Sequence, residues 1–402
     1  MASICLNMIV KDEGHIICNT LKNICENIKI DYWVISDTGS TDNTVELIKS
    51  FFSEKNIPGE IVFHQWSNFS ENRNFALDAC SGKSDYILFF DADDYFVGNF
   101  QLPELNLDAY HCQLSSSSNN IRYLRKLIIK NDGSYKWKGV LHEFLESSKN
   151  GKVGEISGDY YVVSGRTGNR SQDQEKYLKD AKVLEKAFYD GKDVDLLPRY
   201  AFYCAQSYRD FGLIDEAIHW YQKRVEMDSG WYDEKNYSYE QLGLLFEKKK
   251  NSKEALYYWQ CGISSASNRA ECWYHLARWH SWNKNFSLAY CLAKQASQIK
   301  KPEGNRLFLN NAIYTYWCLY EWCLNAFRLG KVEESYSVFK QLIQHCPADL
   351  VDRLSSNFEK YKPYILKDSF LEVQRLSDYL QKMNKEFILS KVLDMPLIES
   401  EG

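Results

Sequence analysis

Tyr86-Ile87-Leu88-Phe89-Phe90 is followed directly by Asp91-Ala92-Asp93-Asp94. Five consecutive apolar residues have the length of a short buried strand, and the lack of polar alternation is typical of a sheet that is covered on both faces. Asp91 and Asp93 are spaced i and i+2, so both can reach one Mg²⁺ or Mn²⁺ ion, which prefers oxygen ligands. Aspartates also gather in solvated turns, and the spacing alone does not separate the two interpretations.

The residues before this strand alternate between strand and helix patterns. Apolar runs predict strands at residues 4–10, 32–36, 61–63 and 86–90, and apolar periodicity predicts helices at 16–28, at 41–52 with Ser40 or Thr41 as N-cap, and from Ser70 onward. Alternating strands and helices with short connections indicate a mostly parallel sheet with helices on both faces. We therefore predict a Rossmann-like α/β domain over residues 1–168.

Asp37 stands at the end of the second predicted strand, shortly before Gly39-Ser40-Thr41. Ligands of open α/β sheets bind beyond the carboxyl ends of the strands, so we expect Asp37 and the Asp91 cluster to face one crevice. A carboxylate there can accept hydrogen bonds from a ribose or a base, and a helix start offers unpaired N–H groups. Asp37 is equally compatible with a plain turn before the helix.

Two further polar features are candidates for the same crevice. Arg73, near the start of a predicted helix, can bind a phosphate or a base, or it can be an ordinary surface cation. His142 and Glu143 pair an imidazole with a carboxylate, and these groups can serve as a metal ligand and a general base. Such a His-Glu pair can also have a purely structural role.

From Gln172 onward, helical patterns replace strand patterns, and a small residue recurs with a partner four positions later. The recurrences are Ala217 with Tyr221, Ala255 with Trp259, Ala289 with Ala293, and Ser335 with Phe339. The small residues stand 38, 34 and 46 positions apart; the middle spacing is the tetratricopeptide period, and the others require loop insertions. Because small residues let paired helices approach closely, we predict an all-α repeat domain over residues 169–402. A generic helical bundle is the alternative.

Composition and charge argue against several classes of protein. The 402 residues carry a net charge of −5, so the chain lacks the basic field expected of a nucleic-acid-binding protein. No apolar stretch approaches the ~20 residues of a membrane span, and the N-terminus lacks the features of a signal peptide. The twelve cysteines include no C-x-x-C pair, which favours buried free thiols in a reducing compartment. We expect a cytoplasmic protein.

Five motifs in a fixed order resemble the family 2 glycosyltransferases of the GT-A fold. They are Met8-Ile9-Val10-Lys11-Asp12-Glu13, Ser36-Asp37-Thr38-Gly39-Ser40-Thr41-Asp42-Asn43-Thr44, Trp66 with Phe69-Ser70-Glu71-Asn72-Arg73-Asn74, Phe90-Asp91-Ala92-Asp93-Asp94, and Trp137 with His142-Glu143. Five ordered motifs are more specific than any one of them. Tyr160–Lys186 and Tyr200–Asp210 further resemble the subfamily in which a short GT-A domain is fused to tetratricopeptide-like repeats.

The resemblance implies a metal-dependent transferase with a nucleotide-sugar donor, for which UDP-hexose is the family's commonest choice. It implies that the nucleotide sugar is contacted by Val10, Glu13, Asp37, Arg73, Asp91 and Ala92. Asp91 and Asp93 would hold Mn²⁺ or Mg²⁺ against the diphosphate, which stabilises the leaving group, and His142 would complete the metal shell or position the acceptor. Inversion at the anomeric carbon needs a carboxylate base, for which Glu143 is the first candidate and Asp94 the second.

Three functions are compatible with the sequence. An active transferase would modify a glycan or a protein or peptide, whereas a scaffold would combine a degenerate GT-A domain with repeats that recruit partners. The intact set of Asp37, Asp91, Asp93 and Glu143 favours the enzyme. A nucleotidyltransferase usually has a glycine-rich, basic loop after the first strand, which Lys11-Asp12-Glu13-Gly14 does not supply. We expect the repeats to bind the acceptor or to form a homodimer.

Overall fold

The structure is a computed structural model that describes residues 2–116, 119–165, 167–304, 306–385 and 388–389. The chain divides into two compact units, residues 1–220 and residues 221–402. A sheet with its covering helices comes first along the chain, and helices alone follow, which confirms the predicted fold class. The predicted domain boundary between residues 168 and 169 lies between the last strand and the first helical turn, and it stays a prediction.

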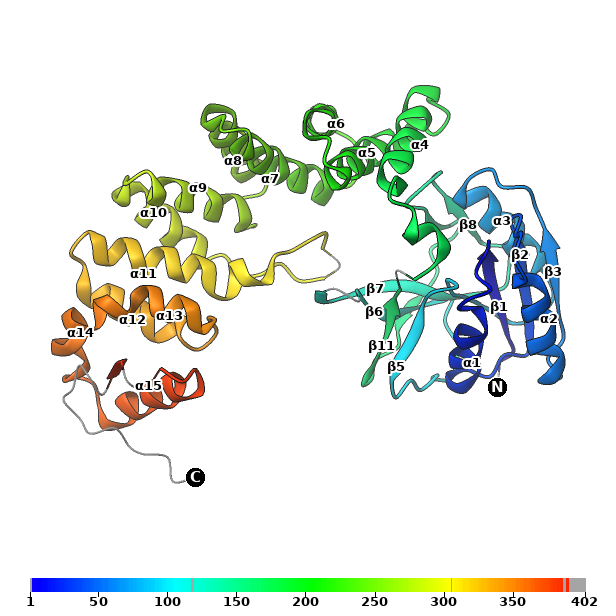
Figure 1. The fold of residues 1–402 in the computed structure, drawn as a ribbon, viewed down its shortest axis with the longest axis horizontal. Coiled ribbons are helices and arrows are strands. Elements are labelled where there is room, and N and C mark those ends of the chain that lie inside the picture. Colours follow the sequence, from blue (N-terminus) through cyan, green and yellow to red (C-terminus); the bar gives the residue numbers. More distant parts are fainter. Residues whose placement is uncertain (1, 117–118, 166, 305, 386–387, 390–402) are drawn as a thin grey trace. The chain divides into compact units, whose positions relative to one another are not determined.

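Four parallel strands and their connecting helices build the N-terminal part of the sheet (Figure 1). Their bounds are β1 Ile4–Val10, α1 Ile17–Asn27, β2 Tyr32–Asp37, α2 Thr44–Glu54, β3 Gly59–Phe63, α3 Phe69–Ala79 and β4 Tyr86–Phe89. These strands lie in the order β3-β2-β1-β4, and Asn7 of β1 is opposite Phe89 of β4. Because parallel strands end at one edge, the residues after β1, β2 and β4 gather there.

The remaining strands make the sheet mixed. They are β5 Tyr95–Gly98, β6 Ala109–Ser116, β7 Asn119–Lys130, β10 Val153–Glu155 and β11 Tyr160–Ser164, while β8 Tyr135–Lys138 and β9 Phe144–Ser147 form a separate small sheet. Among the pairings between described strands of the large sheet, five are parallel and three are antiparallel. The prediction of a mostly parallel sheet is confirmed, but the antiparallel strands β6 and β7 were not predicted.

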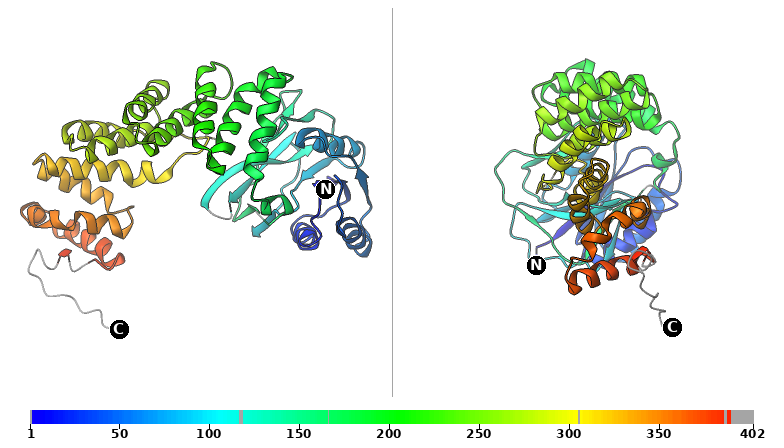
Figure 2. Two further views of the ribbon diagram at one scale, coloured as in Figure 1. Left: turned by 45° about the horizontal axis from the view of Figure 1, so that its top comes forward. Right: turned by 90° about the vertical axis from the view of Figure 1, so that its left-hand side faces the viewer.

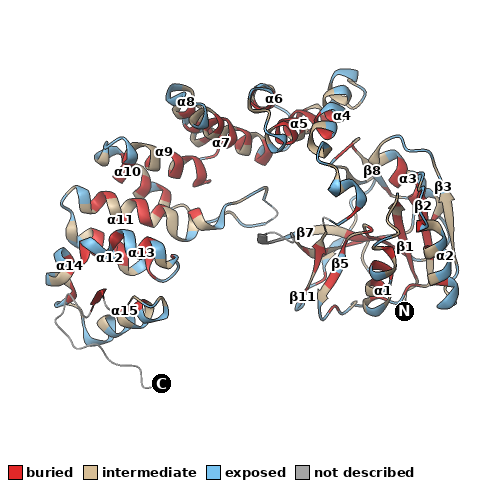
Figure 3. Cartoon of the chain, in the orientation of Figure 1, coloured by how far each residue is buried: buried red, intermediate tan, exposed pale blue. Residues whose placement is uncertain are grey.

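Alternation along β1 sends its side chains into two separate cores. Leu6 packs on one face with Leu21 of α1 and Ile48 of α2. Cys5 packs on the opposite face with Leu77 of α3. Figure 3 shows buried residues along β1 and its neighbouring strands, in keeping with a sheet that is covered on both sides.

The predicted start of α2 was wrong by a few residues. The helix begins at Thr44 with Asn43 as its N-cap residue, not Ser40 or Thr41. The reason is that two carboxylates capture the N–H groups that precede the helix. The N–H of Ser40 donates to Asp37 at 3.0 Å, and that of Thr41 donates to Asp12 at 2.6 Å. This segment is therefore a carboxylate-held turn, and the helix starts after it.

The predicted cap of α3 was also wrong. Asn68, not Ser70, is the N-cap, because its side-chain oxygen accepts the N–H of Glu71 at 3.0 Å. Ser70 lies in the first turn, where its hydroxyl donates to the same Asn68 oxygen. An asparagine preceding a helix satisfies N–H groups that have no intrahelical partner.

The C-terminal half consists of paired helices (Figures 1 and 2). The described helices are α4 Lys176–Asp190, α5 Leu197–Phe211, α6 Ile214–Glu226, α7 Tyr232–Lys248, α8 Ser252–Ser265, α9 Glu271–Trp282, α10 Phe286–Ser297, α11 Cys318–Arg328, α12 Val332–Leu342, α13 Ala348–Leu354, α14 Phe358–Ile365 and α15 Phe370–Lys382. Helix α7 packs on α8, α9 on α10, and α11 on α12. This pairing of consecutive helices is the arrangement that the repeat pattern predicts.

The recurring small residues lie where the paired helices meet. Ala217, Ala255, Ala289 and Ser335 fall in α6, α8, α10 and α12 respectively, and all four are fully buried. In the α7–α8 pair, a Cβ atom added to Gly243 would lie 2.1 Å from Nε1 of Trp259, which is too close for two nonbonded atoms. Gly243 therefore permits the close approach of α7 and α8, as the sequence predicts for small residues between paired helices.

The structure also bears on the expected free cysteines and on the expected lack of membrane spans. All twelve cysteines are free thiols, and most are buried, although Cys291 of α10 is exposed. Within the described part of the chain, no helix has both the length and the apolar character needed to cross a bilayer.

Candidate active site

Asp91 lies just beyond the end of β4 and pairs with two guanidinium groups. Its Oδ1 accepts a hydrogen bond from Nη2 of Arg73 at 2.7 Å, and its Oδ2 accepts one from Nη1 of Arg125 at 3.2 Å. Burial disfavours the charged carboxylate, but the two arginines outweigh burial and hold the pKa of Asp91 below its usual value. Asp91 is therefore ionised, and each of its oxygens is already engaged by a cation.

Arg73 connects Asp91 to a second carboxylate. Its side chain comes from α3, and its Nε donates to Oε1 of Glu143 at 2.7 Å. The guanidinium also lies over the ring of Trp137, with Cζ 5.0 Å from the ring centroid. Only 7% of the Arg73 side chain is exposed, so its charge depends on these partners for compensation. We call Arg73, Asp91, Glu143 and Arg125 the Arg73 network.

Arg125 is the member of this network that the sequence analysis missed. It lies on β7, which runs antiparallel to β4 with Leu88 opposite Ile128. Continuing that register by three residues on each strand brings Asp91 opposite Arg125. The only sequence signal is a basic residue before the apolar run Leu127-Ile128-Ile129, and that signal has no meaning until β7 is known to lie beside β4.

A second acidic group forms around the main chain that follows β11. Asp93 accepts the N–H of Gly168 through Oδ2 at 3.2 Å, and Glu13, which follows β1, accepts the N–H of Asn169 through Oε2 at 3.2 Å. A Cβ atom on Gly168 would lie 3.2 Å from one oxygen of each carboxylate, so Asp93 and Glu13 flank this glycine. Burial raises the pKa of Glu13, and the negative charge of Asp93 adds to that rise.

Asp94 is the most deeply buried carboxylate of the motif. Its Oδ1 accepts the N–H of Gly165 at 3.3 Å, and the side chain is almost inaccessible to water. Burial raises the pKa of Asp94 well above its usual value, and the charge on Asp91 raises it further. The environment thus favours the protonated form of Asp94, in contrast to the ionised Asp91 three residues earlier.

The first part of this domain matches a known family. The family model of glycosyl transferase family 2 matches residues 5–105, which include β1 to β5, Arg73 and the Asp91 motif. The match covers about a quarter of the 402 residues. The match supports a glycosyltransferase function at the level of the general reaction, and paired helices follow the matched residues in the chain.

Solved structures give more distant likenesses. S. aureus TarS, solved for residues 1–349 with UDP-GlcNAc, is 12% identical, with 63% of this chain and 89% of that chain covered and a TM-score of 0.38. The protein MamA is 16% identical, with 42% and 89% covered and a TM-score of 0.34. Glucosyl-3-phosphoglycerate synthase from Mycobacterium tuberculosis, solved with Mn²⁺, UDP and its product, is 19% identical, with 23% and 34% covered and a TM-score of 0.20. No match was found among curated proteins.

The contacts of Asp91, Asp93 and Glu13 decide which of them have an oxygen available for a metal ion. Among the described residues, no group of three or more His, Cys, Asp or Glu side chains is arranged to hold a metal ion. Both oxygens of Asp91 are engaged by arginines, whereas Asp93 and Glu13 each have one oxygen bonded to a main-chain N–H. Mg²⁺ is commonly held by one or two carboxylates together with substrate phosphates. Asp93 and Glu13 fit such a shared site, which needs phosphate oxygens to be complete.

His142 faces away from these carboxylates. Its ring stacks on Tyr203 of α5 with 3.8 Å between centroids, and its main-chain oxygen accepts hydrogen bonds from Arg199 at 3.1 and 2.8 Å. His142 is exposed as a whole residue, but desolvation of its ring on the side packed against Tyr203 lowers its pKa, and Arg199 and Arg170 lower it further. The imidazole is therefore neutral at physiological pH. His142 and Glu143 are adjacent in the chain but have different partners. Glu143 is hydrogen-bonded to Arg73, whereas His142 packs on Tyr203 of α5.

The remaining predicted residues lie at the same edge of the sheet. Val10 is paired with Asp37 across β1 and β2. The Asp37 carboxylate accepts the N–H groups of Gly39 and Ser40, both at 3.0 Å, and so holds its own turn. Ala92 is buried, and its carbonyl oxygen accepts the hydroxyl of Thr20 at 2.5 Å. The structure therefore brings Arg73, Asp91 and Glu143 into direct contact, and it places Glu13 and Asp93 on either side of Gly168. Asp37 instead holds its own turn, and His142 packs on Tyr203.

Proposed function

We propose that this protein is a metal-dependent, inverting glycosyltransferase that transfers a hexose from a UDP-sugar to a hydroxyl group of a glycan or a protein. The observation that carries the proposal is the position of the Arg73 network next to Asp93 and Asp94, at the carboxyl end of β4 in a family 2 domain. A parallel sheet edge of this kind is where α/β proteins bind nucleotides.

Some of the acidic residues would bind the metal ion, and others would contact the nucleotide sugar. Asp93 and Glu13 would hold Mn²⁺ or Mg²⁺ together with the donor diphosphate, and the ion would supply charge neutralisation for the leaving group. Arg73 and Arg125 keep Asp91 ionised and fixed in orientation, so that it can contact the nucleotide sugar without rearranging. Val10, Asp37 and Ala92 complete the proposed nucleotide-sugar contacts along the same edge.

The base proposed for the reaction is Glu143. Its Oε1 accepts from Arg73, which fixes the plane of the carboxylate, and the second oxygen would take the proton of the acceptor hydroxyl. The acceptor oxygen then bonds to the anomeric carbon as the bond from that carbon to the diphosphate breaks. Asp94 is the second candidate, because its raised pKa makes it a stronger base once ionised.

The partners and setting of the enzyme are also proposals. The helical repeats would present a protein or peptide acceptor, or would form a homodimer, and the protein would act in the cytoplasm. His142 would position the acceptor or complete the metal shell only if its ring left Tyr203. The division into a GT-A domain of residues 1–168 and a repeat domain of residues 169–402 belongs to the same proposal.

A non-catalytic scaffold is the second candidate function. The observation that favours it is that both oxygens of Asp91 are ion-paired with arginines, as they would be in a purely structural network. In a scaffold, the Arg73 network would serve stability alone, and the repeats would recruit partners. The two candidates differ in one measurable property, which is binding of a nucleotide sugar.

The test is a donor screen by thermal shift and calorimetry, using UDP-glucose, UDP-galactose and UDP-N-acetylglucosamine with and without Mn²⁺. We expect one donor to stabilise the protein only when Mn²⁺ is present, and Asp93→Ala to abolish that stabilisation. The matched control is Asp159→Ala, which removes an exposed carboxylate from the same domain. If no nucleotide sugar binds under either condition, the transferase proposal fails and the scaffold replaces it.

A further inference from the structure

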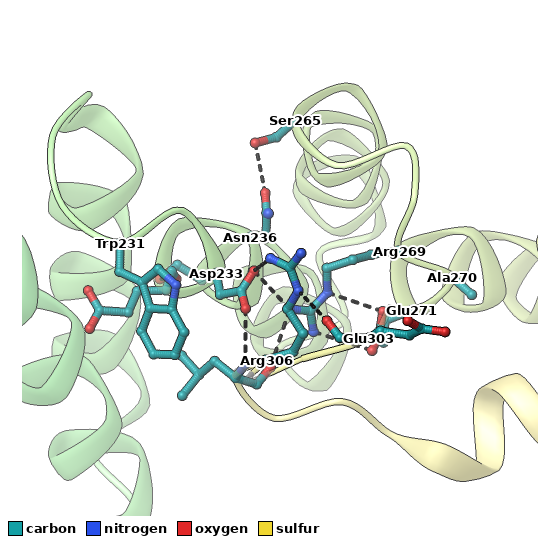
Figure 4. A network of polar contacts seen from close by, with 12 residues as sticks. Trp231, Asp233, Asn236, Ser265, Arg269, Ala270, Glu271, Glu303 and Arg306 are labelled. Carbon is teal, nitrogen blue, oxygen red and sulfur yellow. Dashed lines mark hydrogen bonds and ion pairs between the residues drawn. The ribbon is translucent and has the colours of Figure 1, made fainter. Parts of the chain in front are cut away.

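A short segment of the repeat unit is held by its main chain, as a bound peptide would be. The N–H of Leu307 donates to Oδ2 of Asp233 at 3.0 Å, and the carbonyl oxygen of Leu307 accepts from Nη1 of Arg269 at 3.3 Å. Asp233 belongs to α7 and Arg269 lies two residues before the start of α9, so the two side chains come from different repeats. We call these two residues the Asp233–Arg269 clamp (Figure 4).

The clamp is almost fully buried when the segment occupies it. Only 3% of the Asp233 side chain and 8% of the Arg269 side chain are exposed. Arg269 donates to both carboxylate oxygens of Glu271 at 3.3 Å, and Glu271 also accepts the hydroxyl of Tyr314 at 2.7 Å. A buried carboxylate that loses its hydrogen-bond donor pays a large desolvation cost, so an empty clamp is unfavourable. In the structure, the N–H and C=O of Leu307 satisfy these two side chains.

The segment that fills the clamp comes from an insertion. The small residues Ala289 and Ser335 stand 46 positions apart, twelve more than the tetratricopeptide period, and the extra residues fall between α10 and α11. This connection is not needed to complete the pairing of α9 with α10 or of α11 with α12. It places Arg306-Leu307-Phe308 against the ends of two helices that precede it in the chain.

The flanking side chains show which sequence the clamp accepts. Arg306 lies 3.8 Å from Asp233, and Phe308 lies on the ring of Tyr237 with 4.9 Å between centroids. Without Arg306, the carboxylates of Asp233 and Glu271 face the single guanidinium of Arg269, which leaves a net negative charge. A basic residue before the clamped position therefore complements the site, and an aromatic residue after it has a surface to pack on.

The same segment is held weakly enough to leave. The Arg306–Asp233 ion pair is longer than a hydrogen bond, and the Arg306 side chain is 43% exposed. Phe308 is also largely exposed, and its φ of +46° is a left-handed conformation that costs energy for a bulky residue. The two clamp bonds go to main-chain atoms, which every extended polypeptide has. Another chain can therefore make the same bonds without that strain.

We propose that the Asp233–Arg269 clamp binds the main chain of an extended segment of a partner protein, at a basic residue followed by apolar ones, and that Arg306-Leu307-Phe308 occupies the clamp as a displaceable internal ligand. Since the internal segment is tethered, its effective concentration is high, and the clamp is open to a partner only in the fraction of molecules in which the segment has left. The inference does not depend on transferase activity.

The test uses a fluorescein-labelled peptide with the sequence of residues 302–311 and the full-length protein, with fluorescence anisotropy as the readout. The variant Arg306→Ala/Phe308→Ala weakens the internal segment without changing the clamp, and we expect it to bind the peptide about tenfold more tightly than the wild type. Lys301→Ala, an exposed substitution in the same connection, is the matched control and should bind like the wild type.

The clamp itself is tested on the peptide, so that no buried residue of the protein has to be changed. A peptide with N-methyl-leucine at the position of Leu307 lacks the N–H that Asp233 accepts, and we expect its binding to be lost. Thermal unfolding of the double variant verifies that its fold is intact. Equal binding by the wild type and the double variant, undiminished binding of the N-methylated peptide, or no binding to either protein would each overturn the proposal.

Discussion

Arg73 donates from Nη2 to Oδ1 of Asp91 across 2.7 Å, and this bond joins α3 to the end of β4. The same guanidinium donates from Nε to Glu143 at 2.7 Å, so one charge serves two carboxylates. Removing it would leave both carboxylates short of a partner in a site that water reaches poorly. Stability and the proposed chemistry are therefore coupled at this residue.

Arg73→Met is expected to lower the free energy of unfolding by about 3 kcal/mol, because Glu143 loses its cation and Asp91 keeps only Arg125. Urea unfolding followed by circular dichroism measures the change. Lys22→Met, in the exposed pair of Lys22 with Glu26, is the control and should unfold close to the wild type. If the two variants unfold at the same urea concentration, the Arg73 network does not stabilise the domain.

Glu143→Gln is expected to lower kcat by about 10²- to 10⁴-fold, the usual contribution of a general base, while donor affinity is retained. Glutamine keeps an oxygen that can accept from Arg73, so the orientation of the side chain should persist. Steady-state kinetics with the donor identified by the screen measures both quantities. Glu146→Gln, at an exposed position nearby, is the control. A loss of kcat in Asp94→Asn but not in Glu143→Gln would reassign the base to Asp94.

Gly243→Ala tests whether helix propensity or packing dominates stability at this position of α7, because the two effects have opposite signs. Propensity alone predicts that alanine stabilises α7 by about 1 kcal/mol. The added Cβ would lie 2.1 Å from Nε1 of the fully buried Trp259, so we expect a net destabilisation of about 1–3 kcal/mol in urea unfolding. The penalty should shrink in a Trp259→Phe background, which makes room for the methyl group. A more stable Gly243→Ala protein would show that α7 and α8 are not held this closely.

Glu321 of α11 gives the repeats a defined pH dependence. Burial raises its pKa above the usual 4.5, although Ser281, Asn325 and Arg328 oppose the rise. The folded state thus binds the proton more tightly than the unfolded state, and stability falls as pH increases from 4.5 through the raised pKa. Glu321→Gln removes this fall, so its stability advantage over the wild type should grow across that window. Urea unfolding at a series of pH values would contradict the prediction if the two curves stayed parallel.

Local sequence patterns were sufficient to locate the site residues that directly follow strands. Asp37 and Asp91 could be placed at one edge because each comes directly after an apolar run, and parallel strands end together. Arg125 could not be placed, because β7 meets β4 through a long-range antiparallel pairing that leaves no local signal. The cap of α2 was misplaced for a related reason, because Asp12 takes the N–H of Thr41 from far along the chain. The cap of α3 was a local choice between two polar residues, which Asn68 makes by accepting the N–H of Glu71.

The sequence by itself determined the order of the first four strands and their helices, the family 2 motifs and the repeat of small residues, since these depend on periodicity and on groups close together in the chain. Only the tertiary structure decided what each charged group pairs with. Asp91 is engaged by Arg73 and Arg125, while Asp93 and Glu13 each keep one oxygen outside their main-chain hydrogen bond. The motif that suggested a metal site thus contains one carboxylate bound to arginines and one that can serve a metal. The physical reason is that a buried charge takes whichever partners the fold brings within about 3 Å, and chain spacing does not specify those partners.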